Sequence, residues 1–276
     1  MNWSLIWAIA RKDLKEAAQN KAAVIPAAVV PLVLIVIFPL AIILLPQAFG
    51  EAALGSGFSL EELQSLLQRM PPAVTQALAA LSPLQVWIVF TTGYLFAPMF
   101  LILPLMMSSI VASDSFVGEK ERKTLEGLLY SPTSDAELIL GKIVASVLPA
   151  LGLCWASFAV YSLVVNVAGF PLMGRVWFPT ALWWPLMLWV VPAVAVLGMA
   201  SAVIISSRVS TFMEAYQMSA AGVVLVLALV AGQVTGVLFL SVPVALLVGL
   251  GVWVLDAGLL WLGVRTFSRN RLFSRL

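Results

Sequence analysis

Residues Asp114–Lys142 read DSFVGEKERKTLEGLLYSPTSDAELILGK, and this charged stretch interrupts a chain that is otherwise strongly apolar. Of the 276 residues, 62% are hydrophobic and 10% are charged, and the mean hydropathy is +1.06. Soluble domains have about 25% charged residues, so the solvent of this chain must be largely lipid. The sequence predicts an all-α, polytopic membrane protein in which the charged stretch lies outside the bilayer.

Six apolar segments are long enough to cross a bilayer, since a hydrocarbon core of about 30 Å needs about 20 helical residues. We place these spans at residues 22–46, 84–112, 139–168, 181–205, 217–239 and 243–264.

The basic residues predict the orientation of the spans, because loops rich in Lys and Arg stay on the inner side of the membrane. With both termini inside, only Arg69 and Arg175 of the 15 basic residues lie outside. We therefore expect a multi-pass protein of the cytoplasmic (inner) cell membrane, with N- and C-termini in the cytoplasm.

The first residues, 1–21, predict an amphipathic helix that lies in the cytoplasmic interface of the membrane. Its apolar side chains are expected on one face, opposite Arg11, Lys12 and Lys15: Trp3, Ile6, Trp7, Ala10, Leu14 and Ala17. Two interpretations fit this helix. It is a membrane anchor, or it docks a partner protein.

Two further segments flank the spans. The external loop, residues 47–83, predicts a helical hairpin, because Pro71-Pro72 ends a leucine-rich helix and a second short helix follows. Residues 265–276 form a basic cytoplasmic tail. We predict that residues 1–276 form a single transmembrane domain.

The charged segment itself, residues 113–138, contains a pattern that predicts a short helix near residues 119–130. Leu125, Leu128 and Leu129 share one face of that helix. A solvated loop does not need a leucine face, whereas the groove of a partner protein would use it.

Catalysis by this chain is not expected. It has no histidine and a single cysteine, Cys154, so a zinc site or histidine-based chemistry cannot be built from it. The P-loop pattern G-x-x-x-x-G-K-[ST] is also missing, because Gly141-Lys142 is followed by Ile143. The chain is therefore not expected to hydrolyse ATP.

The run from Glu119 to Lys142 resembles the cytoplasmic signature of ABC transporter type-2 permeases. That signature is E-x-x-x-x-T-L-E-x-L-L-x-[ST]-P, followed by a polar-capped helix that enters the membrane with L-G-K. Arg11-Lys12-Asp13-Leu14 and SSRVSTFMEAYQ, residues 206–217, agree with the same family. The positions that match the signature are Glu121, Arg122, Thr124, Leu125, Glu126, Leu128, Leu129, Pro132, Gly141 and Lys142.

The resemblance implies a permease subunit without its own nucleotide-binding domain. Two such subunits, a second copy or a paralogue, would form the pathway, and separate ABC ATPase subunits would bind ATP and Mg, so this chain itself would hold no cofactor. The helix near residues 119–130 would receive the motion of the ATPase through Glu119, Glu121, Arg122, Thr124, Leu125, Glu126, Leu128 and Leu129. An N-terminal docking helix would contribute Arg11, Lys12, Asp13 and Leu14.

Polar residues within the spans are candidates for the transport pathway, because they are costly in lipid. Asp256 is the one ionisable residue well inside a predicted span, and Tyr94, Asn166 and Gln233 are further candidates. Such sparse polarity favours amphipathic or hydrophobic cargo, such as a drug, lipid or peptide, and the family resemblance implies that the direction is export. No nucleic acid is expected as a partner. A stand-alone secondary carrier or channel is the alternative, although inverted repeats and intramembrane charge networks are not evident in the sequence.

Overall fold

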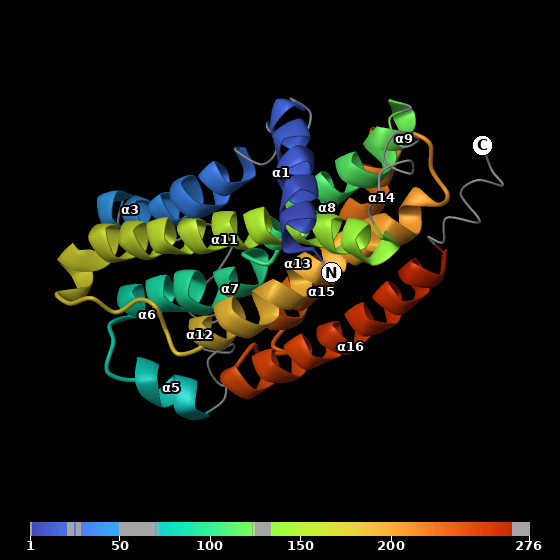
Figure 1. Cartoon of the computed structure of the whole chain (residues 1–276). Coiled ribbons are helices and arrows are strands. Elements are labelled where there is room, and N and C mark those ends of the chain that lie inside the picture. The colour runs from blue at the N-terminus through green and yellow to red at the C-terminus, as the bar shows by residue number, and fades with distance from the viewer. Residues whose placement is uncertain are drawn as a thin grey trace.

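The computed structural model describes residues 2–20, 25, 29–49, 70, 72–122, 124 and 134–266, and within these ranges all regular secondary structure is helical (Figure 1). The predicted all-α fold is thereby confirmed. Six helices are long and apolar enough to cross a membrane: Val29–Ala48, Pro83–Glu121, Glu137–Met173, Trp183–Ser206, Phe212–Val234 and Val242–Gly263. Each overlaps one of the predicted spans.

Several of the spans are built from consecutive helical elements. The first contains η1 (Val33–Ile37) and α3 (Phe38–Phe49), and the third is α11 (Asp135–Met173). The second contains α6 (Pro83–Phe90), η3 (Thr91–Leu95), α7 (Phe96–Met99), α8 (Ile102–Ser113), η4 (Asp114–Gly118) and α9 (Glu119–Glu121). The fourth contains α12 (Trp183–Pro185), η5 (Leu186–Val190) and α13 (Val191–Ser206). The fifth contains α14 (Phe212–Ala220) and α15 (Val223–Val234), and the sixth is α16 (Val242–Thr266).

Among the described residues, two further helices lie outside the spans. One is α1 (Trp3–Gln19), which lies across α11 near one end of the bundle, and the other is α5 (Pro72–Leu78) at the opposite end (Figure 1). We call these ends of the bundle the α1 end and the α5 end. Of the predicted external hairpin, the structure describes α5, while residues 50–69 lie outside the described ranges. Of the predicted helix near residues 119–130, only its start is described, as the last turn of the second span.

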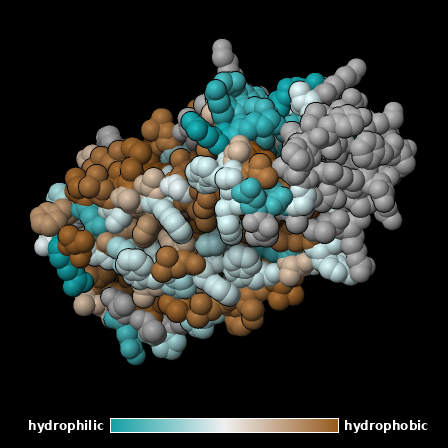
Figure 2. Space-filling view, viewed as in Figure 1, coloured by the Kyte–Doolittle hydropathy of each residue, from teal (hydrophilic) through white to brown (hydrophobic). Residues whose placement is uncertain are grey.

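The second and fourth spans form the centre of the bundle. In their most apolar windows 72% and 56% of the residues are buried, against 17% to 28% in the other four spans. The outer spans leave leucines and valines exposed. Figure 2 shows hydrophobic patches at the upper left and along the lower edge with paler surface between them, while hydrophilic residues gather over α1. This distribution is typical of a bundle surrounded by lipid.

In the part of the chain that the structure describes, four π-helical segments, η1, η3, η4 and η5, interrupt the spans. A π turn displaces backbone carbonyls from the regular helical ladder, and in lipid such carbonyls need other partners. Three consecutive carbonyls of η3 accept hydrogen bonds from three other spans: Thr92 from Tyr161 Oη at 2.7 Å, Gly93 from Trp183 Nε1 at 2.8 Å, and Tyr94 from Gln233 Nε2 at 2.9 Å. In η5, the Met187 carbonyl accepts a bond from Trp155 Nε1 at 3.2 Å. The π segments are thus points where spans are joined by hydrogen bonds.

Close packing of the two central spans depends on Gly198 of α13. A Cβ at this position would lie 2.6 Å from the Leu105 carbonyl oxygen and would also collide with the Ser108 hydroxyl of α8. Because a backbone atom blocks the space, the two helices would have to move apart to admit a side chain.

We expect Gly198→Ala to lower the stability of the bundle by about 1–3 kcal/mol, the usual range for overpacking a core. Gly152→Ala on α11 is the matched control, because a Cβ there meets nothing within 4 Å; it should be neutral or stabilising by up to about 1 kcal/mol. Thermal unfolding of the purified protein in detergent measures both. Equal midpoints for the two variants would contradict the close approach of α13 and α8.

Candidate functional site

Three elements meet at the α1 end: α1, the η4–α9 end of the second span, and the start of α11. Ser134 and Glu137 form a capping box that begins α11, as the sequence pattern indicates. The other Glu137 carboxylate oxygen accepts a hydrogen bond from the backbone N–H of Asn2 at 2.6 Å. The first turns of α1 and α11 are therefore joined through one side chain.

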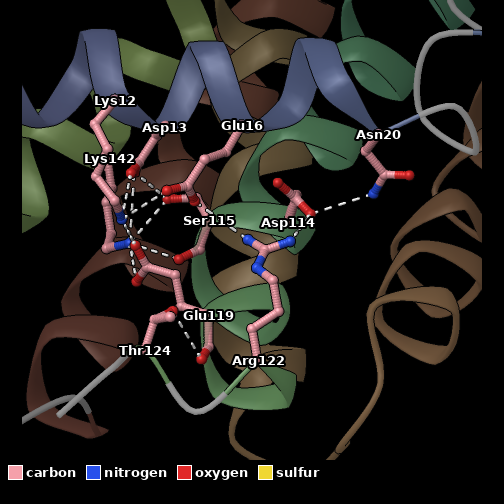
Figure 3. Close-up of polar contacts among 10 residues, drawn as sticks. All are labelled: Lys12, Asp13, Glu16, Asn20, Asp114, Ser115, Glu119, Arg122, Thr124 and Lys142. Carbon is pink, nitrogen blue, oxygen red and sulfur yellow. Dashed lines mark hydrogen bonds and ion pairs between the residues drawn. The ribbon is translucent and has the colours of Figure 1, made fainter. Parts of the chain in front are cut away.

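The centre of this junction is the ammonium group of Lys142, which is fully buried (Figure 3). It donates to Glu119 Oε2 at 2.7 Å, to the Ser115 hydroxyl at 2.9 Å and to the Ser115 carbonyl of η4 at 2.5 Å. Asp13 Oδ2 of α1 lies 3.5 Å from the same nitrogen, and the ring of Phe116 faces it at 5.0 Å. One buried cation of α11 thus binds groups from both of the other elements, α1 and the η4–α9 end of the second span.

The carboxylates that face Lys142 have a second set of partners. Asp13 accepts a hydrogen bond from the Ser115 hydroxyl, and Glu119 accepts one from Lys12. Lys12 also lies 3.5 Å from Asp13 and 3.5 Å from Glu16. The side chains of Asp13, Glu119 and Lys142 are each 0% exposed, so their charges are stabilised by one another and not by water.

A more exposed layer of polar contacts continues the network along η4 and α1 (Figure 3). Arg122 lies 3.1 Å from the buried carboxylate of Asp114 and 3.3 Å from that of Glu16. Asn20 donates to Asp114 at 3.2 Å. This layer joins the last residues of α1 to the end of the second span.

The network contains four carboxylates and three cations, and the surplus of negative charge affects the cations at its edge. Partial burial lowers the pKa of the Lys12 ammonium, but its hydrogen bond to Glu119 and the nearby charges of Glu119, Asp13 and Glu16 outweigh that effect and raise the pKa above its usual value. Burial likewise lowers the pKa of the Arg122 guanidinium, and the hydrogen bond to Asp114 and the nearby acids raise it further than burial lowers it. Both side chains therefore remain cationic throughout the physiological range.

Acidic side chains in this cluster also raise the question of a metal site. Oxygen atoms of Asp13, Glu16 and Glu119 lie within 4.8 Å of one another. The Lys12 and Lys142 ammonium groups already occupy the space that these oxygens face. The arrangement is that of an ion-pair network, in which the lysines provide the positive charge.

The same end of the second span is joined to the connection between the fourth and fifth spans. Glu121 accepts a hydrogen bond from the backbone N–H of Phe212 at 2.8 Å, and Lys120 donates to the Val209 carbonyl at 3.2 Å. Beside these contacts lies an open polar groove of about 720 Å³. Described residues that line it include Glu16, Asn20, Asp114, Glu121, Arg122 and Phe212.

The structure divides the predicted coupling and docking residues into two groups. Asp13 and Glu119 point inward, whereas Glu121, Arg122, Thr124, Arg11 and Leu14 are exposed and Lys12 is partly exposed. Leu125, Glu126, Leu128 and Leu129 lie outside the described residues.

The apolar stripe expected on α1 occupies two different faces of the helix. Its small and medium side chains, Ile6, Ala10 and Ala17, are buried together with Asp13. The large ones are exposed, Trp3 at 70% and Trp7 at 61%. Small residues allow α1 to lie close to α11, and the Lys142 ammonium provides a partner for a carboxylate on that face.

Three of the four predicted pathway residues lie toward the α5 end. Gln233 donates to the Tyr94 carbonyl, and Asn166 bonds the backbone of residues 177 and 178. Asp256 lies about 20 Å away along α16, fourteen residues beyond Val242. Its carboxylate is buried, and neither oxygen has a hydrogen-bond partner among the residues that the structure describes.

Sequence reasoning did not select Glu16, Asn20, Asp114 and Ser115 of the network, and Lys142 entered only as a position that matches the family signature. A signal for Ser115 is its spacing from Glu119, because residues four apart share one face of a helix. The sequence contains no comparable signal for the long-range pairing of Lys142 with Asp13, since these residues are 129 positions apart.

Comparison with protein families gives one match. Residues 7–245 match the family described as ABC-2 family transporter protein. The match includes all of α1 except its first four residues, the whole ion-pair network and five of the six spans. A search of curated proteins finds no match.

We expect Lys142→Met to destabilise the protein by about 3–5 kcal/mol, because it leaves Asp13 and Glu119 buried with fewer partners. Lys15→Met is the matched control, since Lys15 is exposed on α1. Thermal unfolding in detergent measures both effects. Adding Asp13→Asn to Lys142→Met should recover part of the lost stability. An unchanged unfolding midpoint in Lys142→Met alone would contradict the central role of this lysine.

Asp256 provides a second test, because the same substitution can be compared at two buried sites. Asp256→Asn should change the free energy of unfolding by less than about 1 kcal/mol, whereas Asp114→Asn, which weakens the bond to Arg122, should cost about 1.5–3 kcal/mol. Both variants are measured by chemical or thermal unfolding in the same detergent. Equal losses would mean that the Asp256 carboxylate does have a stabilising partner.

Proposed function

The chain belongs to the ABC-2 family of transporter proteins, and we propose that it is the permease subunit of an ABC exporter that is driven by separate ATPase subunits. It is a multi-pass membrane protein with six apolar helices. In the proposed complex the α1 end faces the cytoplasm and receives the ATPases, and ATP and Mg bind to those partners.

The buried network around Lys142 is the observation that carries this proposal. It joins α1, the end of the second span and the start of the third span through charged side chains. The connection between those two spans leaves the network at Arg122 and returns at Ser134. A protein that pushes on this connection would therefore displace both spans and α1 as one body.

The surface beside the network supports docking of a partner at this position. The groove next to Arg122 and Glu121 presents charges of both signs and extends to the start of α14. Leu125, Leu128 and Leu129, predicted to share one helical face, follow directly in the sequence. A polar groove together with the predicted apolar face would provide the mixture of contacts that protein interfaces use.

The exposed face of α1 supports a location in the membrane interface. Trp3 and Trp7 are four residues apart and both point outward, and Arg11 and Lys15 are exposed further along the helix. Tryptophan and basic side chains are typical of helices that lie at the boundary between lipid and water. This placement agrees with the predicted cytoplasmic N-terminus in the inner membrane.

The proposed cargo is amphipathic or hydrophobic, and the pathway is proposed to form between two copies of the chain or between this chain and a paralogue. Within the spans, Tyr161, Trp183 and Gln233 donate their hydrogen bonds to carbonyls of η3. Polar groups used in this way are not available to coordinate an ion or a strongly hydrated solute, which supports a cargo that needs few such contacts.

Replacing both Leu125 and Leu128 with Glu should release the ATPase, because two charges on the apolar face would have to be buried in the interface. We expect at least a tenfold loss of ATPase in affinity purification from the native membrane, with the permease still folded. Replacing both residues with Met is the matched control, since it keeps the face apolar.

The readouts are mass spectrometry of the purified complex, ATP hydrolysis and thermal unfolding of the permease. A wild-type preparation that is folded but contains no ATPase would overturn the proposed function. If the ATPase remains bound to the Glu variant at the wild-type level, the predicted docking position would be wrong, while the proposed permease function would stand.

A further inference from the structure

A cavity of about 550 Å³ lies at the α5 end, far from the ion-pair network. Its volume is within the usual range of ligand pockets, about 300–1,000 Å³. Helix α5, the turn between α11 and α12, and the start of α16 all contribute to its walls. Most of the described lining is apolar, including Val74, Leu78, Leu81, Val89 and Met173.

The cavity lies at the level where several spans end. Met173 is the last residue of the third span, Leu182 directly precedes the fourth, and Val242 begins the sixth. The ends of membrane helices lie where lipid head groups meet acyl chains. A lipid of the surrounding bilayer would therefore reach this cavity with its head group at the rim and a chain inside.

The rim of the cavity carries one positive charge, Arg175. Arg175 is the only charged residue in the ranges that include the described parts of this end, which are residues 38–49, 72–101, 151–199 and 221–250. It is exposed, and within the described structure its guanidinium forms neither a hydrogen bond nor an ion pair with protein. An arginine that has no partner in the described structure and lies next to an apolar cavity is suited to an anionic group that is attached to an apolar chain.

The wall that carries Arg175 is held in a fixed conformation. Gly174 ends α11 with φ at 63°, a left-handed conformation that turns the chain sharply before Arg175. Asn166 then accepts hydrogen bonds from the backbone N–H groups of Trp177 and Phe178 and donates to the Phe178 carbonyl at 2.8 Å. These bonds fix the turn before any ligand arrives, which lowers the entropic cost of binding.

We propose that this cavity binds an anionic bilayer lipid, with its phosphate on Arg175 and one acyl chain among Val74, Leu78 and Val89. The binding requires neither nucleotide nor a partner ATPase, so it can be tested on the chain by itself. Asn166 and Gly174 act as positioning residues, since they shape the rim and lie outside the proposed lipid contacts.

The experiment compares two lipids with identical chains and different heads. The full chain is reconstituted in nanodiscs of phosphatidylcholine that contain a small fraction of either phosphatidylglycerol or phosphatidylcholine with a photoreactive diazirine in one acyl chain. After illumination, digestion and mass spectrometry locate the labelled residues. We expect the anionic probe to label residues 74–89 and 172–182 at least about fivefold more strongly than the neutral probe, as an added charge pair at the rim predicts.

Four variants test the two halves of the site. Arg175→Gln should abolish the preference for the anionic probe, and Arg175→Lys should retain most of it, because only the charge is needed for a contact of this kind. Arg208→Gln is the matched control, since it removes an exposed arginine from the connection at the other end of the bundle. Val242→Trp, at a partly exposed position of the lining, should reduce labelling by both probes because it narrows the cavity.

Each alternative result overturns the proposal. Equal labelling by the two probes, or an unchanged preference in Arg175→Gln, would exclude recognition of the anionic head. Labelling of these segments by a diazirine fatty acid but not by phosphatidylglycerol would identify a free single-chain amphiphile as the occupant. Thermal unfolding of each variant verifies that it is folded before it is compared.

Discussion

The contact between the Lys142 ammonium and the carboxylates of Glu119 and Asp13 constrains the whole α1 end. A charge buried in protein is tolerated only with close partners of opposite sign and satisfied hydrogen bonds. Lys142 is supplied with both by segments that are far apart in the sequence, namely α1 and the end of the second span. Because each partner would be left buried without its counter-charge, these segments are expected to move together or not at all. That property is the one a coupling element needs.

The need of buried polar groups for hydrogen-bond partners also explains how the spans are joined elsewhere. The carbonyls displaced by the π turns of η3 accept bonds from Tyr161, Trp183 and Gln233, and the Ser115 carbonyl of η4 accepts one from Lys142. Helix association in lipid has no hydrophobic driving force of its own, so such bonds and close packing at Gly198 must provide it. Tyr161, Trp183 and Gln233 therefore donate to structural partners, and their presence in a span is weak support for a pathway role. Asp256 differs from them, because neither of its carboxylate oxygens has a hydrogen-bond partner among the described residues.

Hydropathy predicted the fold well, because lipid imposes a minimum length and an apolar composition on each spanning helix. The six predicted spans all correspond to helices of the structure. The extent of the second span was not predictable in this way. We placed its end at residue 112, where the charges begin, yet the helix continues to Glu121 because α1 and α11 neutralise those charges within the protein. Hydropathy describes the solvent of a residue, and it does not identify a partner more than a hundred positions away.

The site could be predicted only in part for a related reason. Asp13 and Glu119 were selected from a family pattern, but their burial depends on Lys142. Lys142 belongs to the same pattern, but the pattern does not show which residues Lys142 contacts. The face of α1 was ambiguous because Ile6 and Trp7 are both apolar, and their sequence positions do not say which one packs against α11. The size of the neighbouring side chains decides which face packs. Ala10 and Ala17 permit α1 to approach α11 closely beside Ile6, whereas two tryptophans would hold the helices apart. The exposed tryptophans are then available to the lipid interface.

The two ends of the bundle use charge in different ways. At the α1 end, the buried acids of the network are paired with bases of the protein, and the partly exposed Lys12 and the exposed Arg122 also have acidic neighbours. At the α5 end, the described structure presents a single arginine, which has no acidic neighbour there. Paired charges resist rearrangement because separating them is costly, whereas an unpaired cation at a lipid boundary attracts an anion from its surroundings. The α1 end is consequently suited to transmit motion within a protein complex, and the α5 end to respond to the composition of the membrane.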